Sequence, residues 1–105
     1  MDIFEKQKEI KKFCADNNME TEIEFRVLDL VSEAGELSKE ILKSSNYGKS
    51  KIELTPNMES EFGDVLFSLM ASANCMNINL EKALNAVLKK YKKRLIKGST
   101  GSEND

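Results

Sequence analysis

The chain has no histidine among its 105 residues. This absence excludes imidazole bases, Ser-His-Asp triads, most catalytic zinc sites and the Glu-x-x-His iron sites of ferritin-like bundles. Cysteine is scarce too: Cys14 and Cys75 are the only two, and each falls in a predicted amphipathic helix, which favours free buried thiols in a reducing compartment over a disulfide. The chemistry is left to carboxylates and amines, and oxygen ligands favour Mg²⁺, Mn²⁺ or Ca²⁺.

Long apolar runs are also missing. No segment approaches the roughly 20 apolar residues of a membrane span, and no leader with basic, apolar and small-residue regions opens the sequence. The formal net charge of −2 argues against a general nucleic-acid binder. We therefore expect a cytoplasmic protein with no membrane and no nucleic acid as partner.

Strand-like alternation is absent, whereas four segments have helical periodicity. They are residues 2–16, a segment from Thr21 to about residue 44, one from Pro56 to about residue 76, and one between Asn79 and Gly98. The short connection 77–79 favours antiparallel packing of the last two helices. The sequence predicts an all-α fold, a four-helix antiparallel bundle over residues 1–97, followed by a disordered polar tail at 98–105.

Two acid pairs have the same helical spacing: Glu33-x-x-Glu36 on the second predicted helix and Glu61-x-x-Asp64 on the third. Residues three apart share one helix face, and both helices carry an apolar stripe, so packing them side by side brings four carboxylates together. Their repulsion then requires a proton, a basic side chain or a cation. Gly35, in mid-helix beside the first pair, indicates close approach of another backbone or of a ligand. A solvated acidic face is the alternative.

The last predicted helix ends in KKYKKRLIK, with six cations in nine residues. Basic residues near a helix C-terminus complement the helix dipole, but six are more than this role needs. An acidic protein partner, a nucleic acid or a polyphosphate would each fit the segment.

The two acid pairs, separated by twenty-four residues and set in AGEL and EFGDVLFSL, resemble the MazG-like nucleotide pyrophosphohydrolases of the all-α NTP pyrophosphatase superfamily. The resemblance covers residues 25–95. It implies that Glu33, Glu36, Glu61 and Asp64 are catalytic ligands of Mg²⁺, with Mn²⁺ as a substitute.

The same resemblance implies that the basic run near the C-terminus binds the phosphates of a nucleoside triphosphate, through Lys90, Lys93 and Arg94. The implied reaction cleaves the bond between the α and β phosphates and yields a monophosphate and pyrophosphate, as nucleotide-pool clean-up. The implied assembly is a homodimer or homotetramer with a pocket completed by a neighbouring chain.

The chain departs from the family's pattern at three positions. Ser32 and Ser60 stand where many members have acids, and Leu88 stands where an asparagine is often found. The number of metal ions and the identity of the general base therefore stay open. Two alternatives also stay open: a phosphoribosyl-ATP pyrophosphohydrolase, and a non-catalytic helical module that binds a basic partner. The second acid pair, on an apolar helix, favours an enzyme over the module.

Overall fold

In the computed structural model, which describes residues 2–98, the chain forms four helices and these residues contain no strand. The helices are α1 (Ile3–Asp16), α2 (Ile23–Ser44), α3 (Pro56–Cys75) and α4 (Leu80–Ile96). The predicted all-α fold class is confirmed, and each predicted helix is present. Residues 99–105, which belong to the predicted tail, lie outside the described residues.

Local sequence signals fix most of the helix ends. The side chains of Asp2, Thr55 and Asn79 each accept hydrogen bonds from backbone N–H groups in the first turn of the helix that follows. Pro56 occupies the first turn of α3, where its missing N–H costs nothing. Gly98 follows α4 with a φ of +83°, a conformation that glycine adopts without strain.

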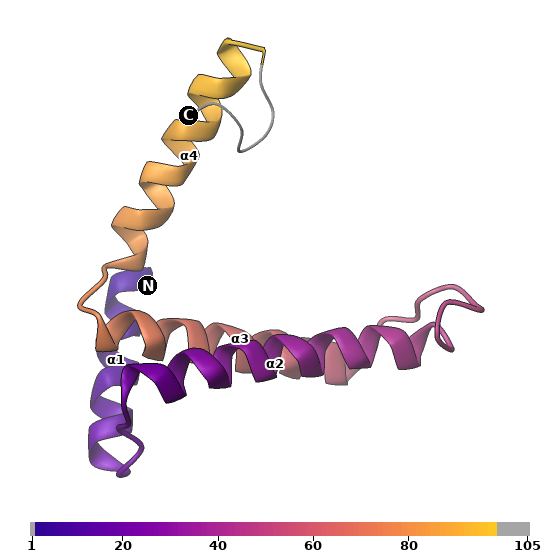
Figure 1. Ribbon diagram of the computed structural model, residues 1–105, viewed down its shortest axis with the longest axis horizontal. Coiled ribbons are helices and arrows are strands. Elements are labelled where there is room, and N and C mark those ends of the chain that lie inside the picture. The colour runs from indigo at the N-terminus through magenta and orange to yellow at the C-terminus, as the bar shows by residue number, and fades with distance from the viewer. Residues whose placement is uncertain (1, 99–105) are drawn as a thin grey trace.

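Helices α2 and α3 run antiparallel, side by side, and are joined by residues 45–55 (Figure 1). Most buried residues in the C-terminal half of α3 are small, and small side chains let neighbouring helices approach closely; they are Ser68, Ala71, Ser72 and Ala73. The Ser72 hydroxyl also lies 3.1 Å from the carbonyl oxygen of Arg26 on α2, so it fixes α3 against the start of α2. This contact positions one acid-bearing segment opposite the other.

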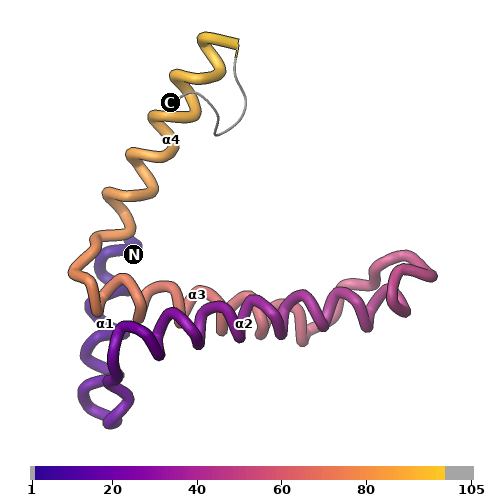
Figure 2. Tube along the Cα trace, in the orientation of Figure 1, coloured from indigo at the N-terminus to yellow at the C-terminus, as the bar shows by residue number. Residues whose placement is uncertain are grey.

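Helix α1 crosses the C-terminal half of α3 (Figure 2). The rings of Phe13 and Phe67 meet edge to face, with their centroids 6.2 Å apart. Both cysteines are free thiols, as predicted, with Cys14 buried and Cys75 half-buried. The buried guanidinium of Arg26 donates to the Met19 carbonyl oxygen and lies 3.6 Å from the Cys14 sulfur, which ties α2 to the end of α1.

Helix α4 does not fold back along α3 as the short connection predicted. It projects away from the α2–α3 hairpin, and its main packing contact is with α1 (Figure 1). Its expected core residues therefore stay uncovered; Leu84, Leu88, Tyr91 and Leu95 are all exposed.

The hairpin also exposes apolar side chains that the sequence assigned to the core. Val31 on α2 is 65% exposed and Phe62 on α3 is 60% exposed. The radius of gyration is 16.9 Å, against about 13 Å for a compact domain of this length. One chain alone thus leaves two apolar surfaces without a partner. Among the described helices, none has both the length and the apolar character needed to cross a membrane.

Candidate active site

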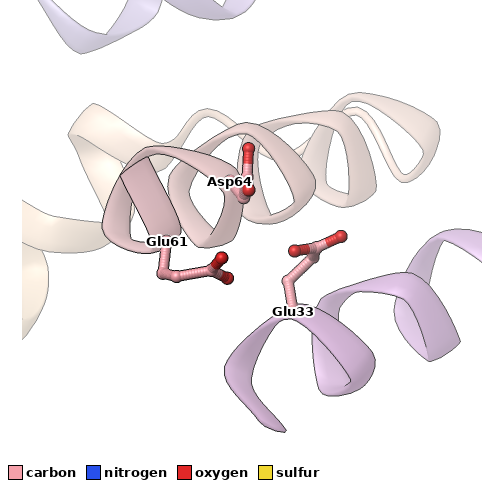
Figure 3. Close-up of side chains that lie close together, drawn as sticks. All are labelled: Glu33, Glu61 and Asp64. Atoms are coloured by element: carbon pink, nitrogen blue, oxygen red, sulfur yellow. The ribbon is translucent and has the colours of Figure 1, made fainter. Parts of the chain in front are cut away.

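Three of the four predicted acids meet on the hairpin. Glu33 extends from α2, whereas Glu61 and Asp64 extend from neighbouring turns of α3 (Figure 3). One carboxylate oxygen from each residue lies within 4.8 Å of the others. The antiparallel pairing of α2 and α3 produces this arrangement, because it places the middle of α2 opposite the first half of α3.

The three oxygens are spaced for a divalent cation. Two ligands of one Mg²⁺ ion lie at most about 4.2 Å apart, and two ligands of Ca²⁺ about 5 Å. A small rotation of the side chains would bring all three oxygens within Mg²⁺ distance. Hard oxygen donors without nitrogen or sulfur select such ions over zinc or copper.

Glu61 combines a buried carboxylate oxygen with negative charges close by. Its Oε2 atom is buried and has no hydrogen-bond partner among the described residues. Burial raises the pKa of Glu61, and nearby negative charges raise this pKa further, in the order Asp64, Glu33, Glu36 and Glu40. A buried carboxylate oxygen without a donor is what a cation or a proton would satisfy.

Glu36 does not join the group of three oxygens. It is exposed on α2, one turn beyond Glu33, and acts on the cluster through its charge on Glu61. The predicted convergence of four carboxylates therefore holds for three of them in the single chain.

Glu40 extends the acidic face by another turn of α2 and has a structural contact that sequence analysis did not find. The hydroxyl of Thr55 donates to its Oε1 atom at 3.3 Å, while the same hydroxyl caps the start of α3. The only sequence signal was the cap itself, Thr55 before Pro56. This contact joins the far end of α2 to the start of α3, beside the acids.

The two glycines beside the acids face open space. A Cβ atom added at Gly35 or at Gly63 would meet nothing within 4 Å. The close approach of another backbone, one of the two explanations considered for Gly35, does not occur among residues 2–98. The surface beside Glu33 and Asp64 is therefore accessible to a ligand or to another copy of the chain.

The predicted phosphate-binding residues are remote from these acids. Lys90, Lys93 and Arg94 lie on α4, which leads away from the hairpin (Figure 1). Arg94 is buried, and its guanidinium lies 5.4 Å from the ring centroid of Tyr91. Within residues 2–98 the ion pairs lie in α1, and none involves an acid of the cluster. The chain alone does not bring its basic helix to its acidic site.

The fold and the site define the class of protein: an all-α protein whose helical hairpin carries a carboxylate cluster suited to a divalent cation. The family model described as the MazG nucleotide pyrophosphohydrolase domain matches residues 15–97, well over half of the chain. The chain belongs to this family, and the resemblance drawn from its acid pairs is confirmed. The family's chemistry is hydrolysis of phosphoric anhydrides in nucleotides.

One relative extends the comparison. The chain is 41% identical over 68 residues to the uncharacterized protein YpjD of Bacillus subtilis (strain 168), a match covering 62% of this chain and 60% of YpjD. The chain thus matches less than two thirds of that relative's length. No solved structure matches the chain significantly.

The raised pKa of Glu61 gives the metal-free protein a pH dependence. A carboxyl whose pKa is higher in the folded state stabilises the fold below its unfolded pKa, and this contribution is lost as the pH rises through the folded pKa. In EDTA we expect the melting temperature to fall over that window, and Glu61→Gln to weaken the fall. Thermal melts from about pH 4 to 8 measure it. Equal pH slopes for the two proteins would contradict the assignment.

Proposed function

We propose that this chain is a Mg²⁺-dependent nucleoside triphosphate pyrophosphohydrolase, with Mn²⁺ as a substitute ion. It cleaves the bond between the α and β phosphates and releases a nucleoside monophosphate and pyrophosphate, in the cytoplasm, as nucleotide-pool clean-up. The observation that carries the proposal is the group formed by Glu33, Glu61 and Asp64, with an unsatisfied oxygen on Glu61, in a chain of the MazG family.

The acids explain how a negatively charged cluster binds a negatively charged substrate. Glu33, Glu61 and Asp64 would hold the cation through one oxygen each, and Glu36, one turn along α2, would complete the set. A bound Mg²⁺ ion supplies Lewis-acid polarisation of the phosphoryl group and a more acidic water. A carboxylate oxygen of the cluster that does not ligate the ion could accept the proton of an attacking water as general base.

The outer phosphates need positive charge that the hairpin lacks. Lys90, Lys93 and Arg94 provide it when α4 comes from another copy of the chain, in a homodimer or homotetramer. Two observations support this assignment: α4 leads away from the acids of its own chain, and both α4 and the hairpin expose apolar faces. Cationic donors are the usual partners of phosphate oxygens and stabilise charge on a leaving pyrophosphate.

Replacing Asp64 with asparagine tests the cation site directly. For a site with a dissociation constant near 1 mM, 10 mM Mg²⁺ stabilises the wild-type fold by about 1.4 kcal/mol. Asp64→Asn keeps the side-chain shape but removes one charge, so we expect this stabilisation to vanish and pyrophosphate release to drop by more than about 100-fold. Glu36→Gln should lower turnover in the same way. Thermal melts and a pyrophosphate assay on a panel of triphosphates, with phosphoribosyl-ATP included, measure both effects.

Glu59→Gln is the matched control, since Glu59 is an exposed acid on the same helix outside the cluster. Its melting temperature, Mg²⁺ response and turnover should stay at wild-type values. Full Mg²⁺-dependent turnover in Asp64→Asn would refute the mechanism. A Mg²⁺ response in the wild type with no hydrolysis of any tested nucleotide would leave a non-catalytic binding module instead.

Replacing Lys93 with glutamine tests the phosphate-binding role of α4. Loss of one charge-assisted contact to phosphate is worth about 1.5 kcal/mol or more, so KM for the best triphosphate should rise by at least about tenfold. The Mg²⁺-induced stabilisation should be unchanged, because Lys93 touches phosphate and not metal. Lys92→Gln, on another face of the same helix, should leave KM unaltered. A KM that responds equally to both substitutions would assign the effect to general charge.

Light scattering at micromolar concentration tests the assembly. We expect twice or four times the mass of one chain, because burying apolar surface on the exposed stripes drives association. Val31→Asp places a charge on the exposed stripe of α2 and should raise the dissociation constant more than tenfold. Ser32→Asp, which adds the same charge one residue along, should not. A monomeric wild type would rule out self-association.

A further inference from the structure

Gln7 is the most completely buried polar residue that the site does not use. It lies on the apolar face of α1 and is 2% exposed. Both ends of its side-chain amide are satisfied: Nε2 donates to the Ile78 carbonyl oxygen at 2.8 Å and to Asn74 Oδ1 at 3.1 Å, and Oε1 accepts from the backbone N–H of Leu80 at 2.8 Å. Asn74 Nδ2 donates in return to the Gln7 carbonyl oxygen at 2.9 Å.

These four residues, Gln7, Asn74, Ile78 and Leu80, form what we call the Gln7 network. It holds three consecutive parts of the chain against α1: the last turn of α3, the connecting turn, and the first residue of α4. The turn is further constrained by Asn77, whose φ of +55° lies in the left-handed region, and by Asn79, which caps α4. The direction in which α4 leaves the turn is therefore set by α1.

That direction separates two apolar surfaces of the same chain. The stripe of α4, which includes Leu84 and Leu88, contacts α1 only near its start, and the hairpin stripe with Leu28 and Val31 stays exposed. The four-residue connection, residues 76–79, is otherwise short enough for α4 to lie antiparallel on the hairpin and cover both stripes. In the structure, the Gln7 network occupies the turn and α4 points away from the hairpin (Figure 1).

We propose that Gln7 is a positioning residue that holds α4 open and thereby commits it to the hairpin of a second copy of this chain. The proposal rests on the self-association proposed above and adds the residue that decides between closure within a chain and exchange between chains. An amide suits this role because it donates to a carbonyl and accepts from an N–H at the same time. No apolar side chain of the same size satisfies both groups.

A second copy is the occupant that the surfaces fit. The end of α4 is basic and the hairpin is acidic, so a second copy offers charges of opposite sign as well as an apolar stripe. The exposed apolar residues of α4 extend from Leu84 to Leu95, which is the length of surface that a helix of another chain covers.

The experiment compares three variants with the wild type. Gln7→Met keeps the length of the side chain and removes its hydrogen bonds, and Asn74→Ala breaks the network from α3. Glu9→Met is the matched control on an exposed position of α1. Spin labels are attached through ketone side chains at Ser38 on α2 and Ala86 on α4, so that both native cysteines stay in place. Labelled chain is diluted with an excess of unlabelled chain, and the distance between the labels within one chain is measured together with the mass by light scattering.

In the wild type and in Glu9→Met we expect one long distance between the labels and an oligomeric mass. In Gln7→Met and Asn74→Ala we expect a shorter population, with a dissociation constant raised at least tenfold. Circular dichroism separates closure from unfolding; a variant that loses its helices is replaced by Gln7→Asn, which keeps the amide but is one methylene too short to reach both sides of the turn.

The outcomes are distinguishable. A short distance in the wild type, or an unchanged long distance in folded variants that break the network, overturns the role of Gln7. An unchanged association constant in those variants overturns the coupling to assembly. A monomeric wild type that still shows the long distance refutes the proposed self-association and leaves the open geometry of α4 standing.

Discussion

The packing of α3 against α2 is the interaction on which the rest of the structure depends. Small buried residues in α3, among them Ser68 and Ser72, let the two helices approach, and the bond from Ser72 to the Arg26 carbonyl fixes one against the other. This bond lies where α2 begins and α3 ends. The pairing that it fixes places Glu33 opposite Glu61 and Asp64, nearer the middle of the hairpin. Contacts between uncharged groups thus hold the acids in place against their mutual repulsion.

The charges of the site and of α4 are complementary but separated. Among the described residues, the acids of the cluster form no ion pair with a basic side chain. The Oε2 atom of Glu61 also lacks a hydrogen-bond donor. The apolar surface is divided in the same way, between the hairpin and α4. A single arrangement, α4 on the hairpin of another copy, would resolve both imbalances together.

Sequence reasoning predicted the helices and three acids that the structure brings together, because both depend on local patterns. Caps such as Thr55 and Asn79 and the i, i+3 acids are read within one turn of helix. The direction of α4 was predicted wrongly; the residue that bonds to its first N–H group is Gln7, seventy-three residues away from Leu80 in sequence. A polar residue on the apolar face of α1 was the available signal. Glu36 lies outside the group of three oxygens, and its i, i+3 spacing from Glu33 does not determine this.

Glu61 would link the effect of pH to the effect of divalent-cation concentration. Its buried oxygen could accept either a proton or a divalent cation, and burial together with the neighbouring acids raises its pKa above the usual value of a glutamate. Below that pKa, one unit of acidification lowers the occupancy of a cation that uses this oxygen about as much as a tenfold dilution of the ion. In that pH range, a cation site of carboxylates alone, in a chain without histidine, would respond to the ratio of free cation to free proton rather than to either concentration by itself.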